Sequence, residues 1–242
     1  MADNYLENQY ESYLARKAAM GKKTLKKKPI IKVQRLQSEA IQALKEIIDQ
    51  PSFRMPFDIF REHLYSAESL YQGYQLGKPG SYKDSYDQQV YQHYLSMGKQ
   101  ATDLKETLAR TLHDHSMTHA MNDFLSHFDE RQVVGIMGGH GLLRTDEAYQ
   151  QVVMVSKTLA ENGCLMVSGG GPGAMEATHL GAWMAGRSEA ETQDALEILK
   201  EAPSFKDRLW LETALQVMQK YPQEQYVSLG VPTWLYGHEP AT

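Results

Sequence analysis

Two consecutive stretches decide the fold: RQVVGIMGGHGLLRTDEAYQQVVMVSKTLAENG at residues 131–163 and CLMVSGGGPGAMEATHLGAWMAG at residues 164–186. Each begins with a short apolar run, passes through a glycine cluster and ends in a helical repeat of apolar residues. Strand, loop and helix in succession, twice, indicate parallel strands joined by right-handed crossovers. The sequence therefore predicts an α/β fold with a Rossmann-like parallel sheet, which would bind ligands at the carboxyl ends of its strands.

Glycine is concentrated in this part of the chain, because eleven of the eighteen glycines lie between Gly135 and Gly186. Glycine lets backbone amides approach an anion, and the helix that follows adds unpaired N–H groups and the positive end of its dipole. The two loops together favour a phosphorylated ligand, although glycine also permits tight turns and close helix–strand packing. Neither loop carries the lysine and hydroxyl of GxxxxGK[ST], so magnesium-dependent triphosphate hydrolysis is not expected.

The predicted nucleotide- and phosphate-binding residues come from both loops. They are Gly138, Gly139, His140, Gly141, Arg144, Ser168, Gly169, Gly170, Gly171, Gly173 and Met175. Arg144 is a candidate phosphate clamp, because a guanidinium can bind two oxygens at once. His140 is a candidate hydrogen-bonding partner of the ligand. Solvent-facing loop positions are the alternative for both side chains.

Glu176 is the candidate catalytic residue. A carboxylate at the start of a helix, three residues after Gly173, can cap backbone donors or accept hydrogen bonds from ribose hydroxyls. In glycosidic cleavage it could also stabilise an oxocarbenium-like ribosyl centre or activate water. An ordinary partner of the helix dipole is the alternative interpretation.

The stretch SGGGPGAMEATHLG at Ser168–Gly181 resembles the motif GGGPGxMEAxxxGA of the LOG-like family, nucleoside 5′-monophosphate phosphoribohydrolases often mislabelled as lysine decarboxylases. VVGIMGGHG resembles the first strand and loop of that family, and YVSLGVPTW at Tyr226–Trp234 resembles its next strand. The resemblance covers about Gln132 to Pro232. It implies a Rossmann-like fold that hydrolyses the N-glycosidic bond of a purine or pyrimidine nucleoside monophosphate, such as AMP, to free base and ribose 5-phosphate. It implies no metal and no cofactor.

The chain departs from the family in one respect. The second family motif, PGGxGTxxE, is absent here, and the arginine and glutamate implicated in catalysis belong to that part of the family pattern. We therefore expect a C-terminally truncated sequence with an incomplete sheet of about three strands. Hydrolysis is expected of the complete protein, and a non-catalytic nucleotide-binding or sensing module is the alternative.

The sequence before the glycine-rich part predicts an arm and a helical region. Nine basic residues and no acidic one lie between Arg16 and Arg35, so residues 1–35 are expected to be a poorly ordered, solvated arm. Residues 36–128 are expected to be helical, because apolar residues recur at helical spacing. The expected helices cover 34–50, 56–74, 86–94 and 101–128.

The nucleotide-binding domain is expected at 129–242, interrupted by a helical insertion at 187–225. Pro203 separates the two helices of this insertion. Lys206, Arg208 and Trp210 could reach a phosphate or a base, but surface charges and one packed aromatic ring are the preferred interpretation.

Composition limits localisation and partners. The sequence has 25 Lys and Arg residues and 30 Asp and Glu residues. It lacks the roughly 18 consecutive apolar residues that a membrane helix needs. A cytoplasmic protein with no membrane partner is expected, since the apolar block of a signal peptide is also missing. The single Cys164 cannot form an intramolecular disulfide. A homo-oligomer is expected, because relatives of the family assemble through helices.

Two further clusters are not expected to bind ligands. Seven tyrosines between Tyr65 and Tyr94 could stack on bases, but their helical spacing favours packing, so no nucleic-acid partner is expected. His115 and His119 lie one helical turn apart, but two histidines alone do not make a metal site.

Overall fold

The structure is a computed structural model that describes residues 42, 46, 54–98, 101, 103–223 and 225–231. The chain divides into two compact units, residues 1–54 and residues 55–242. The predicted arm at 1–35 lies outside the described residues. Of the helix predicted at 34–50, only Gln42 and Glu46 are described, and both are helical.

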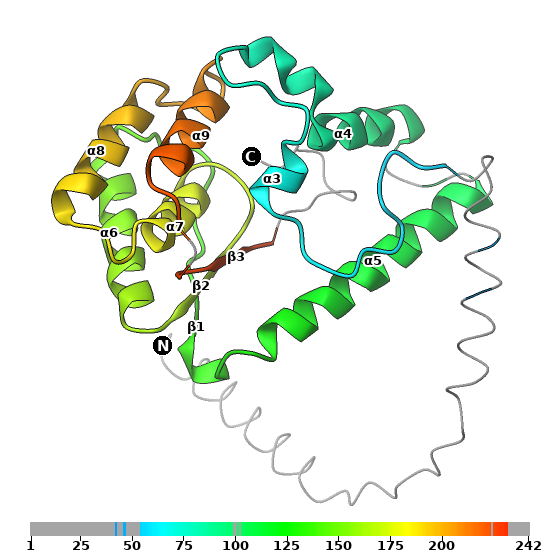
Figure 1. Ribbon diagram of the computed structural model, residues 1–242, viewed down its shortest axis with the longest axis horizontal. Coiled ribbons are helices and arrows are strands. Elements are labelled where there is room, and N and C mark those ends of the chain that lie inside the picture. Colours follow the sequence, from blue (N-terminus) through cyan, green and yellow to red (C-terminus); the bar gives the residue numbers. More distant parts are fainter. Residues whose placement is uncertain are drawn as a thin grey trace, which may run out of the picture. The chain divides into compact units, whose positions relative to one another are not determined.

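The glycine-rich part of the second unit forms a parallel sheet (Figure 1). Its strands follow one another in the order β1-β2-β3, and they comprise β1 (Val133–Gly135), β2 (Leu165–Ser168) and β3 (Ser228–Gly230). In register, Val134 pairs with Met166, and Val167 pairs with Leu229. The predicted α/β class and parallel strand pairing are confirmed.

Helices connect these strands. α6 (Glu147–Glu161) joins β1 to β2, and the longer connection to β3 contains α7 (Ala174–Trp183), α8 (Glu189–Lys200) and α9 (Trp210–Lys220). The helices predicted for the insertion at 187–225 are thus confirmed as α8 and α9. Gly163, predicted as the C-terminal cap of α6, lies one residue after the cap Asn162 and has φ of 84°.

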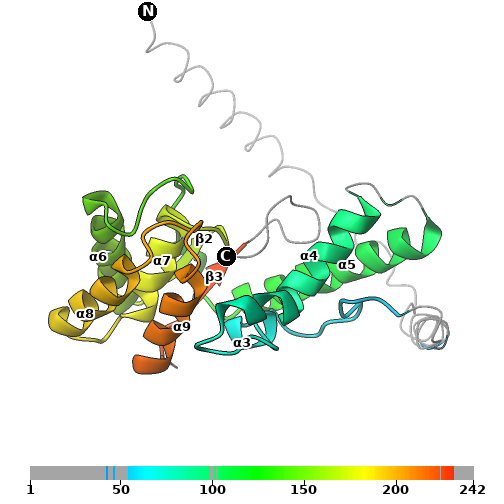
Figure 2. The same cartoon turned by 90° about the horizontal axis from the view of Figure 1, so that it is seen from above.

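The close approach of α6 and α7 depends on one glycine. The helices lie side by side (Figures 1 and 2), and a Cβ on Gly181 would lie 2.3 Å from the carbonyl oxygen of Val153. Around this crossing the fully buried Tyr149, Ala177 and Met184 pack with residues of α8 and α9 in one hydrophobic core. The core therefore fixes α6, α7, α8 and α9 relative to one another.

The segment before the sheet contains short and long helices. These are α3 (Ala67–Leu70), the 3₁₀ helix η2 (Pro79–Asp84), α4 (Tyr86–Met97), α5 (Leu104–Leu125) and the 3₁₀ helix η3 (Glu130–Gln132). Ser85 caps α4 by accepting a hydrogen bond from the Gln88 amide, and Asp103 caps α5 in the same way. α4 and α5 confirm two of the predicted helical repeats.

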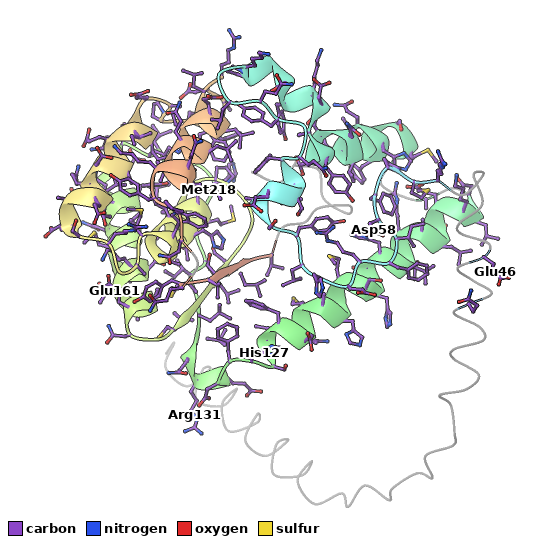
Figure 3. The ribbon with its side chains drawn as sticks, in the orientation of Figure 1. Glu46, Asp58, His127, Arg131, Glu161 and Met218 are labelled. Carbon is purple, nitrogen blue, oxygen red and sulfur yellow. The ribbon has the colours of Figure 1, made fainter. Side chains whose placement is uncertain are left out.

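The predicted helix from Pro56 to Tyr74 is wrong, because residues 54–65 contain no helix and α3 covers only four residues. Phe57 and Ile59 are buried all the same. The Asp58 carbonyl lies 2.6 Å from Nδ1 of His113, and the Asp58 amide donates to the hydroxyl of Tyr86 at 3.1 Å (Figure 3 labels Asp58). Side chains of α4 and α5 thus satisfy backbone groups that a helix would have paired internally.

Within the described residues, no helix combines the length and the apolar character needed to cross a membrane.

Candidate functional site

The first glycine loop folds onto the N-terminus of α7. The Ala174 amide donates to the carbonyl of Gly139 at 3.2 Å. Gly173, the residue before α7, has φ of 74°, and a Cβ there would lie 2.5 Å from the Gly139 oxygen. A Cβ on Gly138 would lie 2.4 Å from that of Ala174. Gly138 and Gly173 are therefore required for this close approach.

The second glycine loop meets the first at the carboxyl end of the sheet. The hydroxyl of Ser168, the last residue of β2, donates to the carbonyl of Ile136 at 2.7 Å, just after β1. A Cβ on Gly169 would lie 2.4 Å from the sulfur of Met175 in α7. The structure thus brings both predicted loops to one place.

Two backbone donors at this end of α7 stay available. The amides of Ala174 and Ala177 donate to the carbonyls of Gly139 and Gly173. Those of Met175 and Glu176 find no acceptor among the described residues. Unpaired N–H groups at a helix N-terminus attract an anion, and the helix dipole adds to the attraction.

Arg144 lies inside the protein and holds Glu176. Its side chain is 1% exposed, whereas that of Glu176 is 15% exposed. Nε of Arg144 donates to Oε2 of Glu176 at 3.0 Å, and Nη2 donates to Oε1. The remaining guanidinium donors bond to three further oxygens. Two of them, the Trp210 carbonyl and the Thr213 hydroxyl, belong to α9, and the third is the carbonyl of Ala202, which precedes α9.

This arrangement gives Arg144 a role that differs from the predicted clamp. Every guanidinium nitrogen already bonds to protein oxygens, and the Trp210 ring centroid lies 4.6 Å from the guanidinium carbon. Arg144 therefore fixes the position of Glu176, and the Glu176 carboxylate is the partly exposed end of the pair.

Tyr149, in the first turn of α6, lies close to this ion pair. It is fully buried, and its hydroxyl has no well-oriented hydrogen-bond partner among the described residues. Burial, and then the negative charge of Glu176, raise the pKa of the Tyr149 phenol well above its usual value, while the positive charge of Arg144 opposes the shift. The phenol therefore keeps its proton at neutral pH, close to the Glu176 carboxylate.

His179 also lies at the candidate site, although its position in the sequence did not predict this. Its Nε2 lies 2.9 Å from the Gly169 carbonyl, and its Nδ1 lies 3.0 Å from the Ser228 hydroxyl of β3. Burial lowers the pKa of His179 below its usual 6.5, so the ring is neutral at pH 7. Because a carbonyl only accepts, Nε2 carries the proton and Nδ1 accepts from Ser228. The one available signal was its place in the MEATHLG stretch.

The other predicted residues differ in exposure. His140 and Gly141 are exposed, and positions for a Cβ on Gly139 or Gly141 meet nothing within 4 Å, so this side of the first loop is open. His115 and His119 lie exposed on α5. The described part of the chain holds no group of three or more His, Cys, Asp or Glu residues suited to a metal ion.

The fold and the site define an α/β protein whose two glycine loops converge at one helix N-terminus beside an Arg–Glu pair. Comparison with known proteins adds no relative: no protein family, no curated protein and no solved structure matches this chain.

Proposed function

We propose that the protein binds a nucleoside 5′-monophosphate at the N-terminus of α7, in a Rossmann-like fold of the LOG type. The observation that supports this most directly is the convergence of both glycine loops at a helix end where the Met175 and Glu176 amides are unpaired. Such donors suit a phosphate group. The strand order β1-β2-β3 also agrees with one half of a Rossmann sheet.

The proposed reaction is hydrolysis of the N-glycosidic bond. Water adds to the anomeric carbon, the bond to the base breaks, and the products are free base and ribose 5-phosphate. Glu176 would accept hydrogen bonds from ribose hydroxyls or stabilise positive charge on the ribosyl centre, because Arg144 holds its carboxylate beside the phosphate-binding amides. The family resemblance at Ser168–Gly181 supports this choice of substrate.

A non-catalytic binding or sensing module is the second candidate. The hydrogen bonds of Arg144 favour this candidate. All guanidinium nitrogens donate to protein oxygens, so the guanidinium is not directed at a substrate. In this alternative the loops bind the nucleotide and no bond is broken.

One experiment separates these functions. The full chain is incubated with AMP, GMP, CMP and UMP, free base is measured by chromatography, and affinity is measured by calorimetry. Binding with base release supports the hydrolase, and binding without release supports the module. Failure to bind any of the four nucleotides overturns both.

A negative charge placed in the second glycine loop tests whether the phosphate binds there. Gly170→Asp brings a carboxylate to the phosphate position, so we expect nucleotide binding to be lost. Gly80→Asp adds the same charge in η2, where a Cβ would meet nothing within 4 Å, and should leave binding unchanged. Equal affinities for the two variants would contradict the assignment of the phosphate to this loop.

A further inference from the structure

The link between α8 and α9 is attached to the first glycine loop. The Arg144 amide donates to the Pro203 carbonyl at 3.1 Å, and Nη1 of Arg144 donates to the Ala202 carbonyl at 3.1 Å. Ala202 is fully buried. Residues 201–209 are therefore held at the loop that the proposed nucleotide site uses.

The tip of this link has a defined conformation. The Ser204 amide donates to the Asp207 carboxylate at 2.8 Å, and the Asp207 amide donates to the Ser204 carbonyl at 2.8 Å. The Trp210 amide then donates to the Asp207 carbonyl at 3.0 Å, where α9 begins. These bonds form a closed turn, so Phe205 is presented by an ordered backbone.

Phe205 places an exposed aromatic ring beside the first glycine loop. The residue is 40% exposed, and its ring meets the His140 ring edge-on, with centroids 6.2 Å apart and planes at 77°. The Lys206 ammonium lies over the Phe205 ring, 5.7 Å from its centroid. The His140 backbone in turn borders the start of α7, because a Cβ on Gly173 would lie 3.1 Å from its Cα.

We propose that Phe205 stacks on the base of the bound nucleotide, with His140 and Lys206 as neighbours of the same ring. The proposal rests on the proposed function, because it assumes that the phosphate binds at α7. A flat aromatic ring offers stacking area to any base, and a neighbouring ammonium can bond to base carbonyls or ring nitrogens. The Phe205 ring therefore recognises a nucleobase without strong preference among bases.

The test compares a ligand that has a base with one that lacks it. The affinities of AMP and ribose 5-phosphate are measured by calorimetry for the full chain and for Phe205→Ala. We expect AMP affinity to fall about 5- to 150-fold, because stacking on one base contributes about 1–3 kcal/mol, whereas ribose 5-phosphate affinity stays unchanged. Leu209→Ala is the matched control, since Leu209 lies in the same link, is 43% exposed and has no aromatic ring that could stack on a base.

A conservative variant and a spectroscopic signal complete the test. Phe205→Tyr keeps the ring and should restore AMP affinity. The adenine protons of bound AMP should move upfield in NMR spectra of the parent chain and of Phe205→Tyr, because a stacked ring shields them, and this shift should vanish in Phe205→Ala.

Each result has one meaning. If Phe205→Ala binds AMP as the parent does, or loses both ligands equally, the stacking role is overturned while the nucleotide site stands. If the parent binds neither ribose 5-phosphate nor any of AMP, GMP, CMP and UMP, the proposed function itself is overturned.

Discussion

Arg144 shows how one residue can hold a candidate site together without being exposed to solvent. Its guanidinium is almost fully buried, and the charge is tolerated there because Glu176, two backbone carbonyls and the Thr213 hydroxyl surround it. Removing one member of a buried ion pair leaves the other charge unpaired, which costs more than the pair itself contributes. The Arg–Glu pair is therefore a point where folding and the proposed function coincide.

The burial of the Arg144–Glu176 pair leads to a prediction for stability. Arg144→Met should lower the free energy of unfolding by about 3–5 kcal/mol, because the Glu176 carboxylate loses its partner. The double variant Arg144→Met/Glu176→Gln should lose less than the sum of the two single variants, since no unpaired carboxylate remains. Urea denaturation of the four chains measures both quantities. Strictly additive losses would show that the two side chains do not depend on each other.

At the scale of elements, the site depends on how closely α6 and α7 approach. Gly181→Ala should lower the free energy of unfolding by about 1–3 kcal/mol, because the new Cβ would overlap the Val153 carbonyl and push the helices apart. Gly141→Ala is the control, as its Cβ would meet nothing within 4 Å. Urea denaturation compares the two variants. Similar stabilities would mean that helix contact does not limit this position.

The elements also show what the sequence can predict. The sheet, α6, α7 and the glycine loops were predictable, because apolar runs followed by glycine clusters are local signals. The convergence of both loops at Gly173 followed from parallel strands, whose carboxyl ends share one edge. The fully engaged donors of Arg144 were not predictable, since two of their acceptors, the Trp210 carbonyl and the Thr213 hydroxyl, lie on α9, more than sixty residues along the chain.

The failed helix at Pro56 has a related cause. Phe57 and Phe60 recur at helical spacing, but Phe57 lies outside any helix. It is buried by packing against His93 of α4 and His113 of α5. Tertiary contacts therefore decided a segment whose local pattern pointed elsewhere. Phe205 illustrates the same limit, because its contact with His140 joins two loops that no short motif connects.

On the scale of the whole second unit, Glu212 connects the segment before the sheet to α9. Its side chain is largely buried and accepts hydrogen bonds from the Tyr74 hydroxyl and, at 2.6 Å, from the Gly77 amide. The next residue, Thr213, bonds to Arg144. A single turn of α9 thus contacts both the 74–77 turn and the Arg–Glu pair of the candidate site.

Glu212→Gln should release the 74–77 turn while α6 stays folded. Glutamine offers one neutral acceptor oxygen where the carboxylate offers two oxygens that share one negative charge, and a hydrogen bond to a charged group contributes about 1.5–3 kcal/mol. We therefore expect the Gly77 amide to exchange with deuterium about tenfold faster or more, measured by mass spectrometry of peptides covering 71–78. Glu197→Gln, at an exposed carboxylate of α8, is the control and should leave this exchange unchanged. Unchanged exchange in Glu212→Gln would show that the turn is held by other contacts, and faster exchange throughout α6 would show that Glu212 supports the whole unit instead of one connection.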